Sequence, residues 1–251
     1  MKEIYMTLYD KEKTLITKEN ADEILKAFAK EYKKQYGICN PVEIIIVGGG
    51  SILLNYDFRL ASQDFDITTQ PKERIKEITG KIADQYNLPD NWMNMDFMKT
   101  ASYSDKLREV SKHYRSFNNE SIEFRTVKAQ YLIAMKMVSA REYRNDISDI
   151  VGILSFMKKN SEEISIEIID AAIDKLYGDR SKVIKDEVYN KVRGYVDLTS
   201  EELDVEYERL HQSESELGQA LTSIDKKYSN VVKEDNIQNI IASLKRRQEK
   251  K

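Results

Sequence analysis

The chain has 251 residues, a formal net charge of −3, one cysteine and two histidines. This small negative charge gives the whole surface no strong attraction to nucleic acid. The single cysteine, Cys39, excludes an internal disulfide and any multi-thiolate zinc site. Because His113 and His211 lie far apart in the sequence, histidine-centred acid–base or zinc chemistry is not expected. Carboxylates and lysines must therefore do any chemistry.

Membrane insertion is not expected either. No apolar run approaches the ~18 residues of a transmembrane helix, and the start of the chain lacks the apolar segment of a signal peptide. We therefore expect a cytoplasmic protein. Few glycines and prolines beside abundant Glu and Lys favour helices, and the length allows one large domain or a core domain with a helical one.

The most informative stretch follows a predicted amphipathic helix at residues 20–36. Residues 43–47 are short, β-branched and followed by glycines, which favours a buried strand. Glycines 48–50 let the backbone turn sharply and leave its N–H groups uncovered. Ser51 is expected to cap the helix that comes next. A helix N-terminus with bare amides is an anion site, most often for phosphate.

Two acids follow on a second predicted strand, which runs to Thr69. Asp64 and Asp66 are two residues apart, so their side chains project to the same face. Adjacent carboxylates repel each other unless a cation lies between them. Mg²⁺ takes one or two carboxylates together with substrate phosphates and water. The glycine turn and the acid pair together predict a metal–nucleotide site.

Three other interpretations of this stretch compete with the metal–nucleotide site. A P-loop requires a lysine directly before Ser51, and there is none. A dinucleotide-binding loop would use Gly48 and Gly50 but place Leu53 at its third small position. Since Asp66 lies at roughly the distance of a ribose-binding acid, a dehydrogenase is weakened but not eliminated. The third is an ordinary turn beside a solvated acidic strand.

The motif Gly-Gly-Gly-Ser, a short helix, and then Arg-x-x-Ser-x-Asp-x-Asp resembles the nucleotidyltransferase superfamily with the DNA-polymerase-β-like core. More narrowly, it resembles the bacterial abortive-infection type, often toxins of toxin–antitoxin pairs. The resemblance covers about residues 20–155. It implies an α+β fold: a small mixed sheet flanked by helices, with a C-terminal all-helical region.

The resemblance also implies roles for particular residues. The metal would be Mg²⁺, held by Asp64 and Asp66. The nucleoside triphosphate would be bound by the residues of the glycine turn and of the lead-in to the acids: Gly49, Gly50, Ser51, Arg59 and Ser62.

The middle of the chain gives fewer signals. A helix is predicted at residues 72–86, but residues 88–97 show no clear period and residues 100–120 no clear element. Residues 121–127 alternate as a strand, with Glu123 and Arg125 on one face. Glu123 is the best positional candidate for a third carboxylate, and the alternative is a plain Glu–Arg surface pair.

A strongly apolar helix is predicted at residues 128–142, with Lys136 in its middle. A buried ammonium is costly unless it is paired or bound to a ligand. The next predicted helix starts with Asp146 and Asp149, which ordinary capping would explain. The resemblance instead implies that Lys136 contacts the nucleotide phosphates and that Asp149 completes the site, where it could act as base.

Only helices are predicted further on, at residues 161–176, 181–192 and 200–228, with one more near the C-terminus. The heptad-like pattern of the longest is broken by Glu214. We therefore expect a nucleotidyltransferase-like core with an N-terminal helix at residues 1–127. The helical region would be residues 128–251, of which 128–158 complete the site and 160–251 are an extension.

The predicted function is a Mg²⁺-dependent nucleotidyltransferase that moves a nucleoside monophosphate from a triphosphate to an acceptor. The resemblance implies a toxin-like enzyme with an RNA acceptor, such as a tRNA end, or a protein acceptor, and an antitoxin protein as a partner. The alternative is a binding or regulatory protein that kept the fold and lost catalysis.

Overall fold

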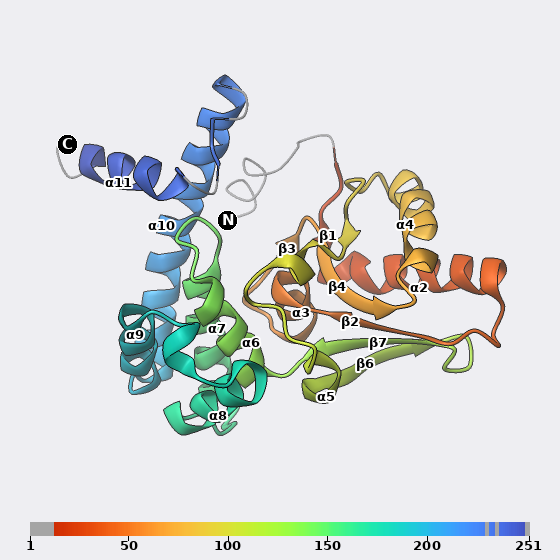
Figure 1. Ribbon diagram of the computed structural model, residues 1–251, viewed down its shortest axis with the longest axis horizontal. Helices are drawn as coiled ribbons and strands as arrows, with labels where there is room; N and C mark the ends of the chain where they lie inside the picture. The colour runs from red at the N-terminus through yellow and green to blue at the C-terminus, as the bar shows by residue number, and fades with distance from the viewer. Residues whose placement is uncertain (1–12, 229–230, 234–235, 249–251) are drawn as a thin grey trace.

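The computed structural model describes residues 13–228, 231–233 and 236–248. The chain forms an α+β protein in which a sheet with its helices lies beside a bundle of helices (Figure 1). The first twelve residues of the expected core lie outside the described residues.

The main sheet has five strands in the order β5-β4-β2-β7-β6. The central strand β2 is antiparallel to β4 and parallel to β7. The strands are β2 (Val42–Ile46), β4 (Phe65–Gln70), β5 (Met93–Asn94), β6 (Ser111–Phe117) and β7 (Ile122–Val127). A second, two-stranded sheet pairs β1 (Ile16–Thr17) with β3 (Ala61–Ser62). The end of β2 lies beside the start of β4. The glycine turn that follows β2 and the segment that precedes β4 therefore meet at the same end of these two strands.

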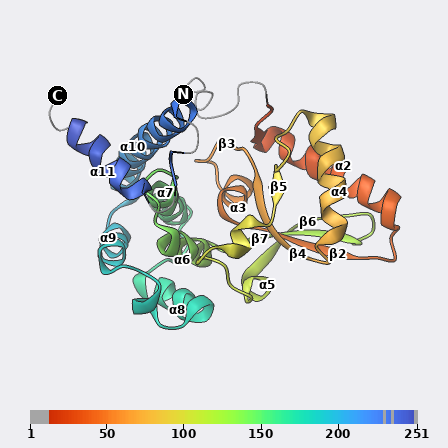
Figure 2. The ribbon, with the colours of Figure 1, turned by 45° about the horizontal axis from the view of Figure 1, so that its top comes forward.

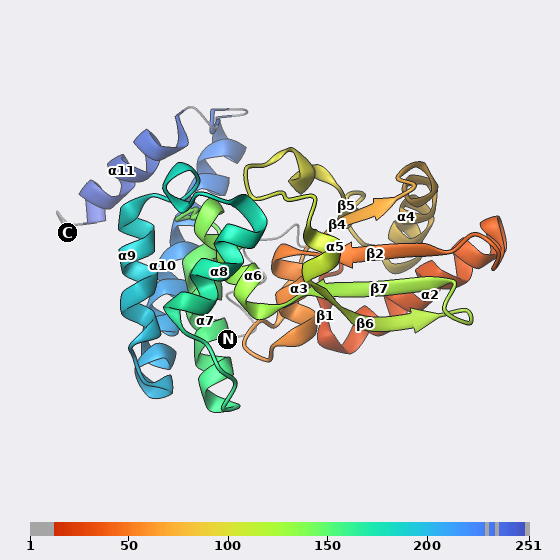
Figure 3. The same cartoon turned by 60° about the horizontal axis from the view of Figure 1, so that its bottom comes forward.

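Helices α2 (Lys18–Tyr36) and α4 (Glu73–Tyr86) cover one face of this sheet (Figure 3). Alternate strand residues point into that layer, as the two-residue period of a strand requires. Ile44, Ile46, Phe65 and Ile67 are fully buried there with Trp92. Burying each such side chain stabilises the fold by roughly 1.5–3 kcal/mol. The opposite face carries the alternate residues, which include Asp66 and Glu43.

The rest of the chain is helical. Its helices are α6 (Ala129–Ser139), α7 (Asp146–Lys159), α8 (Ile166–Tyr177), α9 (Asp186–Val196), α10 (Ser200–Lys227) and α11 (Ile237–Gln248). Helices α6, α7, α8, α9 and α10 share a core of buried Leu, Ile, Val and Met side chains. Val47, which follows β2, and Val127, which ends β7, belong to the same core and connect it to the sheet. Helix α3 (Gly48–Asn55) lies between the two parts (Figure 2) and gives Ile52 to this core and Leu53 to the other. No helix in the described ranges is long and apolar enough to span a membrane.

Two differences from the sequence prediction lie in the stretch that gave no clear element. Residues 100–120 contain α5 (Leu107–Val110) and the edge strand β6. This strand is largely solvent-facing and polar, so it lacks the apolar alternation that marks a half-buried strand. Residues 88–99 contain β5 and the short 3-10 helix η1 (Asp96–Lys99). A two-residue strand is too short to leave any period in the sequence.

The dehydrogenase interpretation is wrong. A dinucleotide-binding unit needs a parallel strand after the glycine helix, on a right-handed crossover. Here the strand after α3 in the main sheet is β4, and it runs antiparallel to β2. The acid at position 66 therefore faces back toward the glycine turn from an antiparallel neighbour.

Candidate functional site

The glycine turn is the first turn of α3. The helix begins at Gly48, its N-cap residue is Val47, and no side chain caps it. The backbone N–H of Ser51 donates to the carbonyl of Val47 at 3.2 Å, which makes it the first helical hydrogen bond. The N–H groups of glycines 48–50 therefore have no partner within the helix, as at any helix start. A helix start of this kind is suited to binding an anion.

Ser51 does not cap this helix, so that expectation is wrong. Its side chain is fully buried, and its Oγ accepts a hydrogen bond from the backbone N–H of Val127 at 3.0 Å. The hydroxyl thus joins α3 to the end of β7. The Ser51 side chain therefore stabilises the packing of α3 against β7.

The backbone or the close neighbours of the turn favour glycine at all three positions. Gly48 has a φ of +55°, a conformation that L side chains rarely adopt, and a Cβ there would lie 3.5 Å from Oδ2 of Asp66. A Cβ on Gly49 would lie 2.6 Å from Nη2 of Arg59, and one on Gly50 would lie 2.5 Å from the ring of Phe65. The glycines therefore let the turn pass close to Arg59 and Phe65, with Gly48 beside Asp66.

The acid pair lies on the sheet face opposite α2 and α4. Asp64 immediately precedes β4 and Asp66 lies within it, while Phe65 between them is buried in the other layer. Burial, and then the neighbouring charge of Asp64, raise the pKa of Asp66 to about 6. Burial also raises the pKa of Asp64, against the opposing guanidinium charges of Arg144 and Arg59. Two crowded carboxylates of this kind are stabilised by a cation between them.

Two neighbours hold the acid pair in place. The side-chain amide of Asn94, the Cα partner of Asp66 on β5, donates to Oδ2 of Asp64 at 3.4 Å. The buried hydroxyl of Ser62 donates to the backbone carbonyl of Asp64 at 2.8 Å. Ser62 therefore orients the segment before β4, and its hydroxyl is already used there.

Arg59 is tied to the helical part of the chain. Its Nη1 donates to both carboxylate oxygens of Asp149, at 2.9 and 2.8 Å. The ammonium of Lys136 lies 2.8 Å from Oδ2 of Asp149 and 2.8 Å from Oδ1 of Asp146. The guanidinium of Arg141 closes the group on Asp146. We call Arg59, Lys136, Arg141, Asp146 and Asp149 the ion cluster.

The ion cluster is largely buried, which determines what its members can do. The side chains of Lys136 and Asp149 are 10% and 3% exposed. Burial alone would lower the pKa of Lys136, but the two carboxylates outweigh it and raise that pKa, so the ammonium stays charged. Since both oxygens of Asp149 are already engaged, the structure does not support its expected role as base. Two of the three N–H donors of the Lys136 ammonium are directed to the two acids, and its contact with a nucleotide phosphate stays a prediction.

Glu123 does not lie with the acid pair, so the third-carboxylate hypothesis is wrong. Its Cα partner on β2 is Glu43, at the opposite end of the strand from the glycine turn. Its carboxylate pairs with Arg125 at 2.6 Å and with His113 at 3.3 Å. No group of three or more His, Cys, Asp or Glu side chains with metal-binding geometry occurs in the described part of the chain.

Arg144 is a site residue that the sequence did not single out by itself. It is exposed in the segment between α6 and α7, and its charge opposes the raised pKa values of both Asp64 and Asp66. No hydrogen bond or ion pair of its side chain is found among the described residues. A free guanidinium near a pair of acids is suited to an anion such as phosphate.

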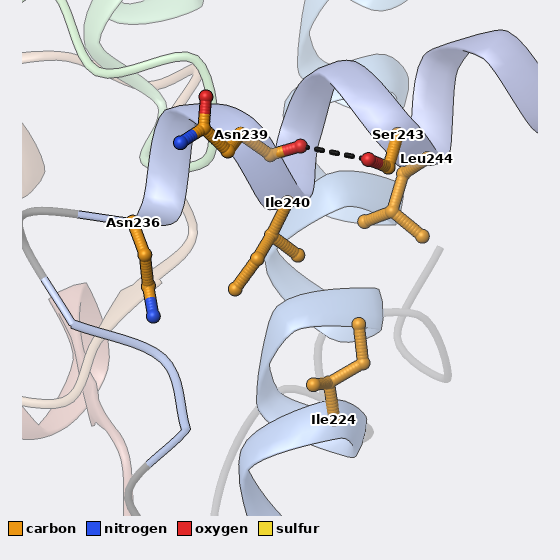
Figure 4. Close-up of a pocket in the computed structure, with 6 residues that line it drawn as sticks. All are labelled: Ile224, Asn236, Asn239, Ile240, Ser243 and Leu244. Carbon is orange, nitrogen blue, oxygen red and sulfur yellow. Dashed lines mark hydrogen bonds between the residues drawn. The ribbon is translucent and has the colours of Figure 1, made fainter.

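Two cavities are found on the surface of the described part of the chain. One, of about 270 Å³, lies between α10 and α11 (Figure 4) and is lined by isoleucine, leucine and short polar side chains, including Asn239 and Ser243. It contains no residue of the predicted site. The other, of about 430 Å³, lies over the sheet face that carries Asp66, between β2, β4 and residues 103–108.

A helix that starts with glycines, facing two alternate acids on the neighbouring antiparallel strand of a mixed sheet, defines a relative of the nucleotidyltransferase superfamily. Residues 22–193 match the family described as nucleotidyltransferase of unknown function (DUF6036). The chain belongs to this family. Comparisons with curated proteins and with solved structures gave no match.

Proposed function

We propose that this protein is a Mg²⁺-dependent nucleotidyltransferase that transfers a nucleoside monophosphate from a nucleoside triphosphate to an acceptor hydroxyl. One observation carries the proposal. The turn that carries the uncapped N–H groups lies beside the carboxylate of Asp66, because a Cβ on Gly48 would be in van der Waals contact with Oδ2 at 3.5 Å. A phosphate chain on the amides would thus share a cation with the acids.

The donor set fits Mg²⁺. This ion is usually bound by one or two carboxylates, with substrate phosphates and water completing the shell. Asp64 and Asp66 supply the two carboxylates, and burial raises the pKa of both, so a divalent cation would relieve the cost of ionising them. When bound, the ion would neutralise the triphosphate and orient it for attack.

The chain's own residues have three tasks in this proposal. The amides of glycines 48–50 bind the phosphates, and Arg144 approaches them from the helical part. These groups stabilise the charge that develops on the departing pyrophosphate. The ion cluster holds Arg59 beneath Gly49, where the guanidinium lies against the glycine backbone. Arg59 and Lys136 therefore act by keeping the turn in position and by their positive charge.

The test uses Asp66→Asn. The amide cannot hold Mg²⁺ as a carboxylate does, so we expect loss of nucleotide transfer. The fold should persist or gain stability, because the substitution removes a buried carboxylate whose pKa is raised. Transfer is measured with α-labelled triphosphates and Mg²⁺, and binding by the Mg²⁺-dependent rise in unfolding temperature with each triphosphate. A saturating ligand should stabilise the protein by about 2.7 kcal/mol at a hundredfold excess over its Kd.

The exposed Asp84 on α4, on the other side of the sheet, provides the matched control. Asp84→Asn should leave both readouts unchanged. A well-folded Asp66→Asn variant that transfers nucleotide at the wild-type rate would refute the metal-site assignment.

A second candidate function is a nucleotide-binding regulatory protein without catalysis. This candidate is favoured because, among the described residues, the site has two acids and no third carboxylate. At the end of β7 nearest the glycine turn the residue is Val127. This candidate predicts Mg²⁺-dependent stabilisation by a triphosphate with no transfer to protein or RNA. A toxin role and an antitoxin partner would be tested by whether expression of the wild-type chain, but not of Asp66→Asn, arrests growth.

A further inference from the structure

The cavity of about 430 Å³ lies over the sheet face that carries Asp66. Its floor includes Ile45 and Thr68, which are Cα partners on β2 and β4. The next pair along the same face is Val47 and Asp66, whose backbones are joined by a hydrogen bond of 2.9 Å. Two residues along a strand span about 7 Å. The cavity is thus one residue pair from the acids, on the side away from the glycine turn.

This position has a consequence for the transfer that we propose above. In phosphoryl-type transfer the attacking and leaving oxygens lie roughly in line on opposite sides of the phosphorus. If the β- and γ-phosphates lie on the amides of α3, the leaving oxygen is on the side of the glycine turn. The attacking oxygen would then approach from the opposite side, over the sheet, where the cavity lies.

We propose that this cavity receives the acceptor, and that the acceptor is a polypeptide segment bearing a hydroxyl group. The inference rests on the proposed function and adds the acceptor class to it. The acceptor oxygen would bond to the α-phosphorus while the bond from that phosphorus to the bridging oxygen of pyrophosphate breaks. Pyrophosphate leaves with the bonding electron pair, and the hydroxyl proton passes to water in the cavity.

The charges of the cavity favour a polypeptide over a nucleic acid. Nucleic acids are held through Lys and Arg contacts to their phosphates. The cavity walls carry the carboxylates of Glu43 and Asp105, and the single guanidinium, that of Arg108, is paired with Glu43 at 2.9 Å. The remaining polar lining is uncharged and includes Thr68, Gln70 and Tyr103. Such groups suit the N–H and C=O of a peptide and leave no free cation for a phosphate backbone.

The first test fills the cavity. Thr68 is half-buried on its floor, so Thr68→Trp would block the acceptor without touching the glycine turn. We expect transfer to fall roughly a hundredfold, as misplacement of a reacting group does. The stabilisation by triphosphate and Mg²⁺ should stay at the wild-type level, which also verifies the fold. The acceptors are the separated protein and RNA fractions of a cell extract of the source organism, incubated with α-labelled triphosphates.

The second test distinguishes the acceptor classes by the sign of its effect. Asp105 is exposed at the cavity wall, and Asp105→Lys reverses its charge. A polypeptide acceptor suited to an acidic wall should be labelled about tenfold more slowly, whereas RNA would be labelled faster. Asp84→Lys makes the same charge change on the far side of the sheet and should have no effect.

The expected result is label in the protein fraction that is sensitive to protease and resistant to ribonuclease, and lost in Thr68→Trp. Label in RNA, or faster labelling by Asp105→Lys, would overturn the polypeptide acceptor. Normal transfer by Thr68→Trp would overturn the cavity assignment while the nucleotidyltransferase proposal stands. If no triphosphate stabilises the wild-type protein, the proposed function fails, and the acceptor inference fails with it.

Discussion

A buried acid on α10 should make the stability of this protein depend on pH. Glu214 is 5% exposed, and its two carboxylate oxygens accept the backbone N–H groups of Ile147 and Ser148 at 3.0 and 3.2 Å. It thus caps the start of α7 from another helix. Burial raises its pKa from 4.5 to about 7, although the two N–H donors favour the charged form.

The sign and size of the effect follow from this shift. Below the unfolded value of 4.5 the group is protonated in both states, and its contribution to stability is fully present. As the pH rises toward about 7, the unfolded chain releases a proton that the folded chain keeps, so stability falls. With about 1.4 kcal/mol for each pKa unit, the loss is about 3 kcal/mol.

The perturbation is Glu214→Gln, which removes the titration and keeps one acceptor oxygen. We expect the wild-type free energy of unfolding to fall by about 3 kcal/mol more than that of the variant between about pH 4.5 and about pH 8. Urea unfolding at several pH values measures both. Glu216→Gln, on the exposed side of the same helix, is the control and should keep the wild-type slope. Identical slopes for wild type and Glu214→Gln would show that the carboxylate stays ionised at the start of α7, contrary to this reasoning.

Two further predictions concern residues whose roles differ from those first expected. Asp149→Asn leaves Arg59 and Lys136 facing a neutral amide, so urea unfolding should show a loss of about 3–5 kcal/mol; a loss under 1 kcal/mol would contradict a buried ion cluster. Ser51→Ala deprives the buried N–H of Val127 of its acceptor and should cost about 1–3 kcal/mol of stability. The affinity of this variant for triphosphate, measured at saturating Mg²⁺, should equal that of the wild type. A large loss of affinity would show that the Ser51 hydroxyl does contact a phosphate.

The sequence was sufficient for the parts of the site that are local in the chain. The strand before the glycines, the glycine turn and the alternate acids lie within about twenty-five residues, and the two-residue period of a strand fixes the side on which both acids project. The α+β class and the helical C-terminal region also follow from local patterns. These predictions needed no knowledge of which strands pair.

The contacts that the sequence did not reveal are those between distant segments. Lys136 and Asp149 carry the residue types of a phosphate contact and a base, and only the fold shows that they pair with each other and that Asp149 also pairs with Arg59. In the same way, Glu214 looked like a flaw in a heptad pattern. Its position opposite the start of α7 depends on helix packing across more than sixty residues, which leaves no local signal.

The cap at Glu214 also bears on where this protein could be divided. The family match ends at residue 193, yet the helix that carries this carboxylate starts at Ser200. A fragment trimmed to the matched residues would lack α10. Two N–H groups of α7 would then lose their acceptor, and the face of α7 that packs on α10 would be exposed. Asp149 lies in the first turn of α7, so we expect such a fragment to weaken the ion pair between Asp149 and Arg59. Truncated variants of this protein should therefore keep α10, because its Glu214 supports the start of α7.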